Sequence, residues 1–347
     1  MNLVEILNTI RDNASATYQE RIPEATQNNL ETIQAAMVDG DNIMVANEFM
    51  GTLLNKIVKS FVHNKLFENP LKRLKKGTKP LGDGVEEIYN NFLKGAEYDP
   101  TGAKLMARNL PDTKAIYHRM NRKSQYTVTV SREALVKAFS SWENLESYIR
   151  NIMQSLYNSA NLDEFTLTKQ LMVTALENAA MKFIEIPDPL ASEANGKECI
   201  KAVKTISGLM RFPSKEYNAY LDAQDTDDIP IITFSEKNEQ VLILPTAEDT
   251  SLAVDVLAST FNMSVADFND TQKIVVDLFP NVTVGEKTYK VHGFLADEAF
   301  FQIFDDLFGI TTFENGQGLY TNYYLNVWQT LAYSILVNCV AFVSVVA

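Results

Sequence analysis

The sequence predicts an α+β protein organised around one long helix. Residues 140–182 contain no Gly or Pro, and their apolar residues recur at helical spacing. The chain from Asn315 to its end carries no charged residue and is rich in Val and Tyr, which favours strands. Between these two stretches, short apolar runs alternate with helical patterns. The sequence therefore predicts, in this order, a long helix, a lobe of mixed helices and strands, and two final strands.

The long helix has a recognisable start and end. Ser140 and Glu143 have the spacing of a capping box, in which two side chains satisfy the first backbone N–H groups. The pattern stops before Ile186–Pro187, because the residue ahead of a proline disfavours helix. A helix over residues 141–182 would be about 60 Å long at ~1.5 Å per residue. The alternative is two shorter helices broken near Asn158–Asn161.

Residues 1–79 are expected to form an N-terminal arm. Thr26–Val38 and Asn47–Phe61 each have the pattern of a helix with one apolar face, and Ile22–Pro23 interrupts the region. The arm has little core of its own, so we expect it to pack on something else. It ends in a basic stretch without interleaved aromatic residues, which favours a subunit or solvent contact over DNA binding: Lys72, Arg73, Lys75, Lys76 and Lys79.

Residues 80–130 are expected to form a long two-limbed hairpin. Val85–Lys94 fits a strand or a helix, and the second limb comprises Lys114–Met120 and Gln125–Val130. Few large apolar residues occupy the tip, so the hairpin cannot bury a core of its own. A long protruding segment in a compact domain is usually functional. We expect it to reach a neighbouring molecule.

The rest of the chain is expected to fold as a mixed lobe followed by two strands beneath the long helix. Thr246 is expected to cap a helix, and Gly309 to end another. The expected strands are Lys182–Ile186, Ile229–Phe234, Val241–Leu244, Ile274–Leu278, a hairpin around Gly285, Leu319–Leu331 and Ile335–Val345. The expected helices are Asn195–Arg211, the segment after Thr246, and Ala296–Phe308.

The charge is unevenly distributed along the chain. The net charge is −13, yet residues 56–137 hold 17 Lys and Arg against 8 Asp and Glu. Such asymmetry suggests that this part meets the opposite charge, either on another copy of the chain or on a polyanion. A solvated basic face is the simpler alternative.

The sequence argues against an enzyme, and it identifies no catalytic, metal-binding or cofactor-binding residue. His63, His118 and His292 are widely separated, and there is no G-x-S-x-G motif. The acidic run Asp222–Asp228 lacks the Gly and closing Glu of a calcium loop. Cys199 and Cys339 match no metal or redox spacing. No secretory leader is expected, and polar residues interrupt the apolar C-terminal stretch too often for a membrane helix.

Two runs resemble the head proteins of small podoviruses. They are Gly84–Asp99, GVEEIYNNFLKGAEYD, and the return from Leu295 to Val343, which begins LADEAFFQIFDDLFG. The order of the parts is similar to that of tailed-phage major capsid proteins with the Hong Kong 97-type fold. This resemblance implies an N-terminal arm (1–79), an extended loop (80–126), a peripheral domain (127–188) with a spine helix (141–182), an axial domain (189–294) and a return to the peripheral domain (295–347).

The resemblance implies a structural protein that assembles with its own copies. Pentamers and hexamers would close into an icosahedral shell around double-stranded DNA, in the virion and, during assembly, in the host cytoplasm. Implied partners are a scaffolding protein, a portal protein and, non-specifically, the packaged DNA, without a membrane or a cofactor. The extended loop would lie on the neighbouring copy. Contact candidates are Arg108, Lys114, Arg119, Arg122, Lys123, Glu86 and Glu87.

Two other classes of protein remain open. An encapsulin-type nanocompartment shell is similar in fold, although the basic 56–79 segment favours the phage protein. An unrelated α/β binding protein is the other alternative.

Overall fold

The computed structural model divides the chain into two compact units. It describes residues 3–346 apart from 39–44, 46–47, 50–51, 53–66, 83, 94, 96, 99, 102–107, 109, 139–141, 222–228 and 253–271. Unit 1 comprises residues 1–69, 121–164 and 305–329, and unit 2 comprises residues 70–120, 165–304 and 330–347. Both units are therefore assembled from segments that lie far apart in the sequence.

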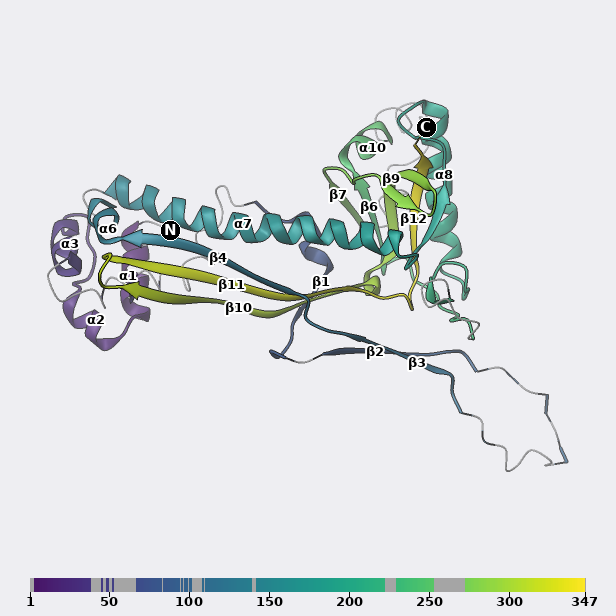
Figure 1. The fold of residues 1–347 in the computed structure, drawn as a ribbon, viewed down its shortest axis with the longest axis horizontal. Helices are drawn as coiled ribbons and strands as arrows, with labels where there is room; N and C mark the ends of the chain where they lie inside the picture. The colour runs from purple at the N-terminus through teal and green to yellow at the C-terminus, as the bar shows by residue number, and fades with distance from the viewer. Residues whose placement is uncertain are drawn as a thin grey trace. The chain divides into compact units, whose positions relative to one another are not determined.

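Unit 1 combines N-terminal helices with long antiparallel strands. Strand β4 (Arg122–Ser131) pairs with β11 (Tyr320–Tyr333), with Gln329 opposite Arg122, and β11 pairs on its other side with β10 (Phe301–Asn315). Figure 1 shows the first part of helix α7 (Trp142–Glu177) lying along these strands, with the N-terminal helices gathered near their ends. The helices that complete the unit are α1 (Leu3–Asn13), α2 (Ala16–Arg21), α3 (Leu30–Val38) and α6 (Arg132–Ala138).

The N-terminal helices share one apolar core with the strands and the long helix. Ile10 and Tyr18 are buried in the same cluster as Leu156 of α7 and Leu325 of β11. Full burial of one such aliphatic side chain contributes about 1.5–3 kcal/mol. The N-terminal region was expected to pack on another structure, and in this chain it packs on α7 and β11 of the same unit.

The long helix is unbroken. Helix α7 (Trp142–Glu177) has 36 residues and runs through Asn158–Asn161, so the two-helix alternative is wrong. It ends five residues before the expected Lys182 because Ala179 adopts a left-handed conformation with φ 53°. The N–H of Ala180 bonds the carbonyl of Ala175 at 2.8 Å, and that of Ala179 bonds Leu176 at 3.2 Å. This pair of bonds is a Schellman motif, formed here without glycine.

Unit 2 is a three-layer structure around a central sheet. The strand order is β5-β12-β9-β6-β7, with β8 paired to β9. Alternate residues of β6 face opposite layers: Leu242 belongs to the core under α8, and Ile243 to the core under the last turns of α7. The elements are β5 (Lys182–Glu185), α8 (Glu193–Leu209), β6 (Gln240–Pro245), α10 (Thr246–Ser251), β7 (Gln272–Val276), β8 (Val282–Val284), β9 (Lys287–Asp297) and β12 (Cys339–Val345).

A separate two-stranded ribbon projects from unit 2 (Figure 1). Strands β2 (Val85–Asn90) and β3 (Thr113–His118) pair antiparallel, with Glu86 opposite Tyr117. We call these two strands the hairpin. A 3-10 turn, η2 (Pro70–Leu74), and strand β1 (Lys75–Thr78) precede it. The expected second limb is wrong in one part, because Gln125–Val130 leaves the hairpin and pairs with β11 instead.

Three sequence expectations fail in the lobe. Ala296–Phe308 is no helix: it contains the end of β9, the 3-10 turn η4 (Glu298–Phe300) and the start of β10 (Phe301–Asn315), so Gly309 is a strand residue. Thr246 does not cap α10, because its hydroxyl donates to the carbonyl of Val276 at 2.7 Å. Ile229–Phe234 forms only an isolated bridge, Thr233 to Ser214.

Other expectations lie outside the described residues or need a smaller change. Ser140 of the proposed capping box, the acidic run Asp222–Asp228 and most of Asn47–Phe61 fall on residues that the structure does not describe. The last expected strand is β12, which lies in the central sheet of unit 2 rather than beside β11. Within the described part of the chain, none of the helices combines the length and apolar character that crossing a bilayer requires.

Candidate subunit-contact surface

The hairpin has one face directed at its own unit and one face directed at solvent. Alternation along a strand sends successive side chains to opposite faces. Val85, Glu87 and Tyr89 are half-buried in β2, whereas Glu86 and Ile88 between them are exposed. We call these the inner and outer faces of the hairpin.

The inner face binds the 230–234 segment of unit 2. The Tyr89 hydroxyl donates to the carbonyl of Ile232 at 2.6 Å. The Asn91 amide donates to the carbonyl of Pro230 at 3.1 Å and accepts from the N–H of Ile232 at 3.0 Å. The rings of Phe92 and Phe234 stack with centroids 6.5 Å apart. These contacts determine the direction in which the hairpin leaves unit 2.

Two predicted contact residues belong to the inner face. Glu87 accepts from the Ser334 hydroxyl at 2.5 Å and lies 3.1 Å from Nε2 of His118. Lys114 lies 3.3 Å from Asp112 and 5.6 Å from the centroid of the Tyr220 ring. Both side chains therefore have intrachain partners that hold the hairpin in place.

The outer face carries large apolar side chains that no described part of the chain covers. Ile88 is 57% exposed and Tyr117 is 66% exposed. The Tyr117 hydroxyl donates to Glu86 at 2.7 Å, and this bond raises the pKa of Tyr117. Further exposed apolar residues continue beyond the strands: Phe92, Leu93, Tyr98 and Leu110. A concentration of exposed apolar side chains of this kind marks an interaction surface.

The predicted cations do not converge on one site. Arg108 and Arg119 are exposed. Arg119 lines a shallow hollow of about 480 Å³ at the base of the hairpin, with Gly82, Gly84, Tyr117 and Met120. Lys123 is exposed and lies 5.0 Å from the ring centroid of Trp328 in unit 1.

Arg122 has a different place from the one expected. It is 5% exposed, and its guanidinium donates to the Gln329 side-chain oxygen, to the Tyr126 hydroxyl at 2.9 Å and to the Ser124 hydroxyl at 3.2 Å. A buried arginine with three intrachain partners is not available to a second molecule. Its place on alternating strand β4 could have signalled burial, since Val128 and Val130 share its strand face.

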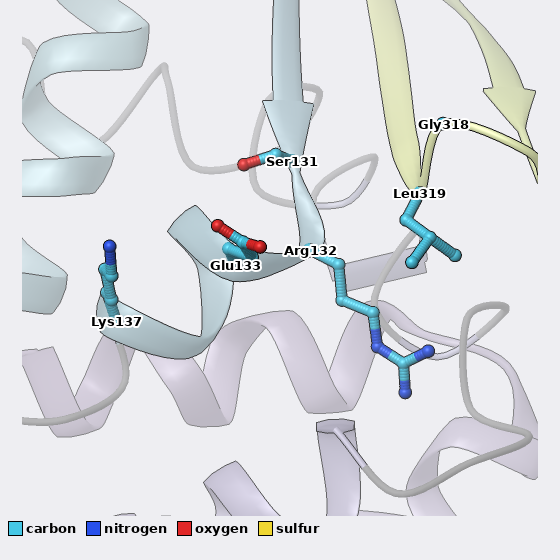
Figure 2. Close-up of a pocket in the computed structure, with 6 residues that line it drawn as sticks. All are labelled: Ser131, Arg132, Glu133, Lys137, Gly318 and Leu319. Atoms are coloured by element: carbon cyan, nitrogen blue, oxygen red, sulfur yellow. The ribbon is translucent and has the colours of Figure 1, made fainter.

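A second hollow, of about 630 Å³, lies in unit 1 where β4 leads into α6. Its lining residues are Ser131, Arg132, Glu133, Lys137, Gly318 and Leu319. Leu319 has a left-handed backbone, φ 48°, in the turn between β10 and β11, and its carbonyl accepts from the N–H of Arg132 at 3.0 Å. Figure 2 shows Arg132 and Lys137 pointing in different directions. The hollow therefore does not gather charge for a small ligand.

One buried cluster has the carboxylate–His–Ser order of a hydrolase triad. It was not predicted from the sequence. His292 Nδ1 lies 3.1 Å from Glu248, and its Nε2 lies 2.8 Å from the Ser344 hydroxyl. The His292 side chain is fully enclosed and Ser344 lies within the ladder between β12 and β9. We interpret the three side chains as a structural link between α10, β9 and β12. Among the described residues, no group of three or more His, Cys, Asp or Glu side chains is placed to hold a metal ion.

Comparison with known proteins identifies close relatives. A profile of the family described as Phi29-like phage major capsid protein matches residues 7–343. The major capsid protein of Bacillus phage PZA is 32% identical over 344 residues, which cover 98% of this chain and 72% of the relative. That of Streptococcus phage Cp-1 is 27% identical over 294 residues, covering 81% of this chain and 77% of the relative.

Solved structures agree on the fold. The capsid structure of Staphylococcus phage Andhra matches with a TM-score of 0.62 and 14% identity, covering 81% of this chain and 85% of that one. A chain from the structure of the head fiber and inner core protein of native bacteriophage P68 matches with a TM-score of 0.62 and 13% identity, covering 81% and 86%. At these identities the likeness establishes the α+β capsid fold.

Proposed function

The chain belongs to the family of Phi29-like phage major capsid proteins, and from this premise we propose that the outer face of its hairpin binds a neighbouring copy in the shell. The protein is a structural component of a tailed-phage capsid, and it associates with its own copies. Its fold is the Hong Kong 97-type capsid fold that the sequence resemblance implied. The encapsulin and the unrelated binding protein are not favoured.

The proposed assembly is an icosahedral shell of pentamers and hexamers around double-stranded DNA. Rings of this kind require heterologous contacts, in which two different surfaces of the same chain meet. The hairpin is suited to one side of such a contact because its inner face is occupied within the chain, while Ile88 and Tyr117 on its outer face are exposed. This two-faced hairpin is the observation that supports the proposal.

The expected strength comes from many weak contacts. Burying the exposed 57% of Ile88 would contribute about 0.9–1.7 kcal/mol, scaled from the ~1.5–3 kcal/mol of a fully buried aliphatic side chain. Arg108 and Arg119 would add about 0.2–1 kcal/mol each by pairing with carboxylates of the neighbour. A shell repeats these contacts in every subunit, so a small loss per contact has a large effect on assembly.

We also propose the remaining partners and the absence of catalysis. A scaffolding protein and a portal protein would guide assembly in the host cytoplasm. The net charge of −13 is suited to holding DNA without binding it tightly, because phosphate binding grows with the number of cations offered. No enzymatic activity is proposed, since the family and its relatives are described as major capsid proteins, which are structural.

The test reverses charge on the exposed cations of the hairpin segment. Arg108→Glu with Arg119→Glu should leave the subunit folded, by circular dichroism and thermal unfolding, and should reduce the yield of shells in electron micrographs. Lys215→Glu is the matched control, because Lys215 is an exposed cation of unit 2 away from the hairpin strands. Normal shells from the double variant, or an equal loss from the control, would reject the proposed contact.

A further inference from the structure

One hydrogen-bonded cluster in unit 1 includes a residue close in sequence to each point where the chain enters or leaves that unit. The chain makes these passages after Asn69, Met120, Glu164, Phe304 and Gln329. Each of these passages has, within two residues of it, one member of a hydrogen-bonded group of side chains. We call this group the junction cluster: Asn69, Arg122, Glu164, Asp305 and Gln329. All five belong to unit 1.

Gln329 is the centre of this cluster. Its side-chain nitrogen donates to Glu164 at 2.6 Å and to Asp305 at 2.7 Å, and its oxygen accepts from Arg122. The second oxygen of Glu164 accepts from the Asn69 amide at 3.1 Å. Both N–H groups and the oxygen of one side chain are therefore used, and each bond leads to a different connecting segment.

The cluster is buried, so its bonds are costly to break. Gln329 is 1% exposed, and Asn69, Arg122 and Glu164 are each less than a tenth exposed. A buried charge without a partner is strongly unfavourable, and removal of one partner commonly destabilises more than the bond itself contributes. The neutral Gln329 amide separates the Arg122 cation from two carboxylates and gives each charge a partner.

Three of the five connections are continuous regular elements. Helix α7 passes through Glu164, strand β10 through Asp305 and strand β11 through Gln329. The backbone N–H of Asn121 also donates to the carbonyl of Gln329 at 3.3 Å. The cluster therefore joins regular elements that continue on both sides of it.

We propose that Gln329 is the hub of a clasp within unit 1, a positioning residue that ties together the five segments by which the chain enters or leaves that unit. The proposal concerns a single folded chain and does not depend on shell assembly. Loss of the hub would loosen the five junctions together and leave the core of each unit intact.

The experiment measures amide hydrogen exchange, by mass spectrometry, in Gln329→Glu. The substitution keeps the size and the acceptor for Arg122, but it removes both N–H donors and places a third carboxylate beside Glu164 and Asp305. We expect exchange to rise at least about tenfold in peptides covering all five junctions, while peptides of β12 and α1 stay unchanged. Gln125→Glu is the control, because Gln125 joins the same two strands through an exposed bond to Asn326 at 2.7 Å.

A second variant keeps the test decisive if Gln329→Glu alone unfolds. In Gln329→Glu with Glu164→Gln, the amide introduced at 164 can donate to the carboxylate introduced at 329, whereas Asp305 still faces a carboxylate. Exchange should return to the parent level in peptides around Asn69 and Glu164 and stay fast around Asp305. The proposal is overturned if exchange in the single variant rises only within β11, or if the double variant slows every junction equally or none.

Discussion

The inner face of the hairpin offers a test in which two adjacent asparagines should behave differently. Asn91 donates to Asp112 at 2.6 Å and to the carbonyl of Pro230 at 3.1 Å, and it accepts from the N–H of Ile232 at 3.0 Å. Asn91→Ala removes all three side-chain bonds. Two of the three connect the hairpin to the 230–234 segment, so the change should weaken docking of the hairpin.

The magnitude follows from the number of bonds. A net contribution of about 0.5–1.5 kcal/mol per hydrogen bond gives roughly 2–3 kcal/mol for the three bonds of Asn91, allowing for partial exposure. Since 1.4 kcal/mol is a factor of ten, the fraction of chains with an undocked hairpin should rise by about 30- to 150-fold. Global unfolding should change much less, because the hairpin contributes few residues to the core of unit 2.

Hydrogen exchange of the peptides containing β2 and β3 is the direct assay. Asn90→Ala is the control, because exposed Asn90 makes one side-chain bond, accepting from the Thr113 hydroxyl at 2.6 Å. It should change exchange less than about threefold, as expected for an exposed bond of a few tenths of a kcal/mol. Equal effects of the two substitutions would refute the assignment of an inner and an outer face.

Three further predictions concern the two buried thiols, the end of helix α7 and a buried glycine. Burial raises the pKa of the Cys199 thiol to about 12 and that of Cys339 well above its usual value, so at pH 7.5 both thiols should react with Ellman's reagent on the order of 10³ times more slowly than in denaturant. Ala179→Gly should raise the free energy of unfolding by about 0.5–1 kcal/mol in a urea titration, because glycine adopts φ 53° without strain; a loss of stability would contradict the Schellman assignment. Gly293→Ala should lower it by roughly 1–3 kcal/mol in the same assay, since an added Cβ would lie 2.9 Å from the carbonyl of Ile243, and an unchanged midpoint would contradict this packing.

The elements that could be predicted from sequence are those with a strong local signal. The α7 pattern has many apolar residues at one spacing, and the turn at Gly285 needs a left-handed residue, φ 62°. Strand β10 lacked such a signal. The apolar residues at its start come in adjacent pairs, Phe300–Phe301 (of which Phe300 ends η4) and Ile303–Phe304, and such pairs fit either a helix or a strand buried on both faces. Its pairing with β11 across the turn at Leu319 decides between them, and the local apolar pattern does not reveal that pairing.

The candidate surface was predictable in outline and not in detail. A hairpin around residues 80–126 could be inferred from its Gly- and Pro-containing middle and its alternating limbs. The roles of individual charges could not, because they depend on which strand face meets unit 2. Lys114 and Arg119 look alike in the sequence, yet Lys114 lies by Asp112 and Tyr220 while Arg119 is exposed. Arg122 required knowledge of Gln329, more than two hundred residues away in the chain.

Electron microscopy of the purified protein, with light scattering for particle mass, tests the account most directly. The chain should be expressed both alone and together with a scaffolding protein. We predict closed shells, or sheets of five- and six-membered rings, in at least one of these conditions. A protein that stays a single chain or a dimer in every condition, with the hairpin docked as described, would contradict the account.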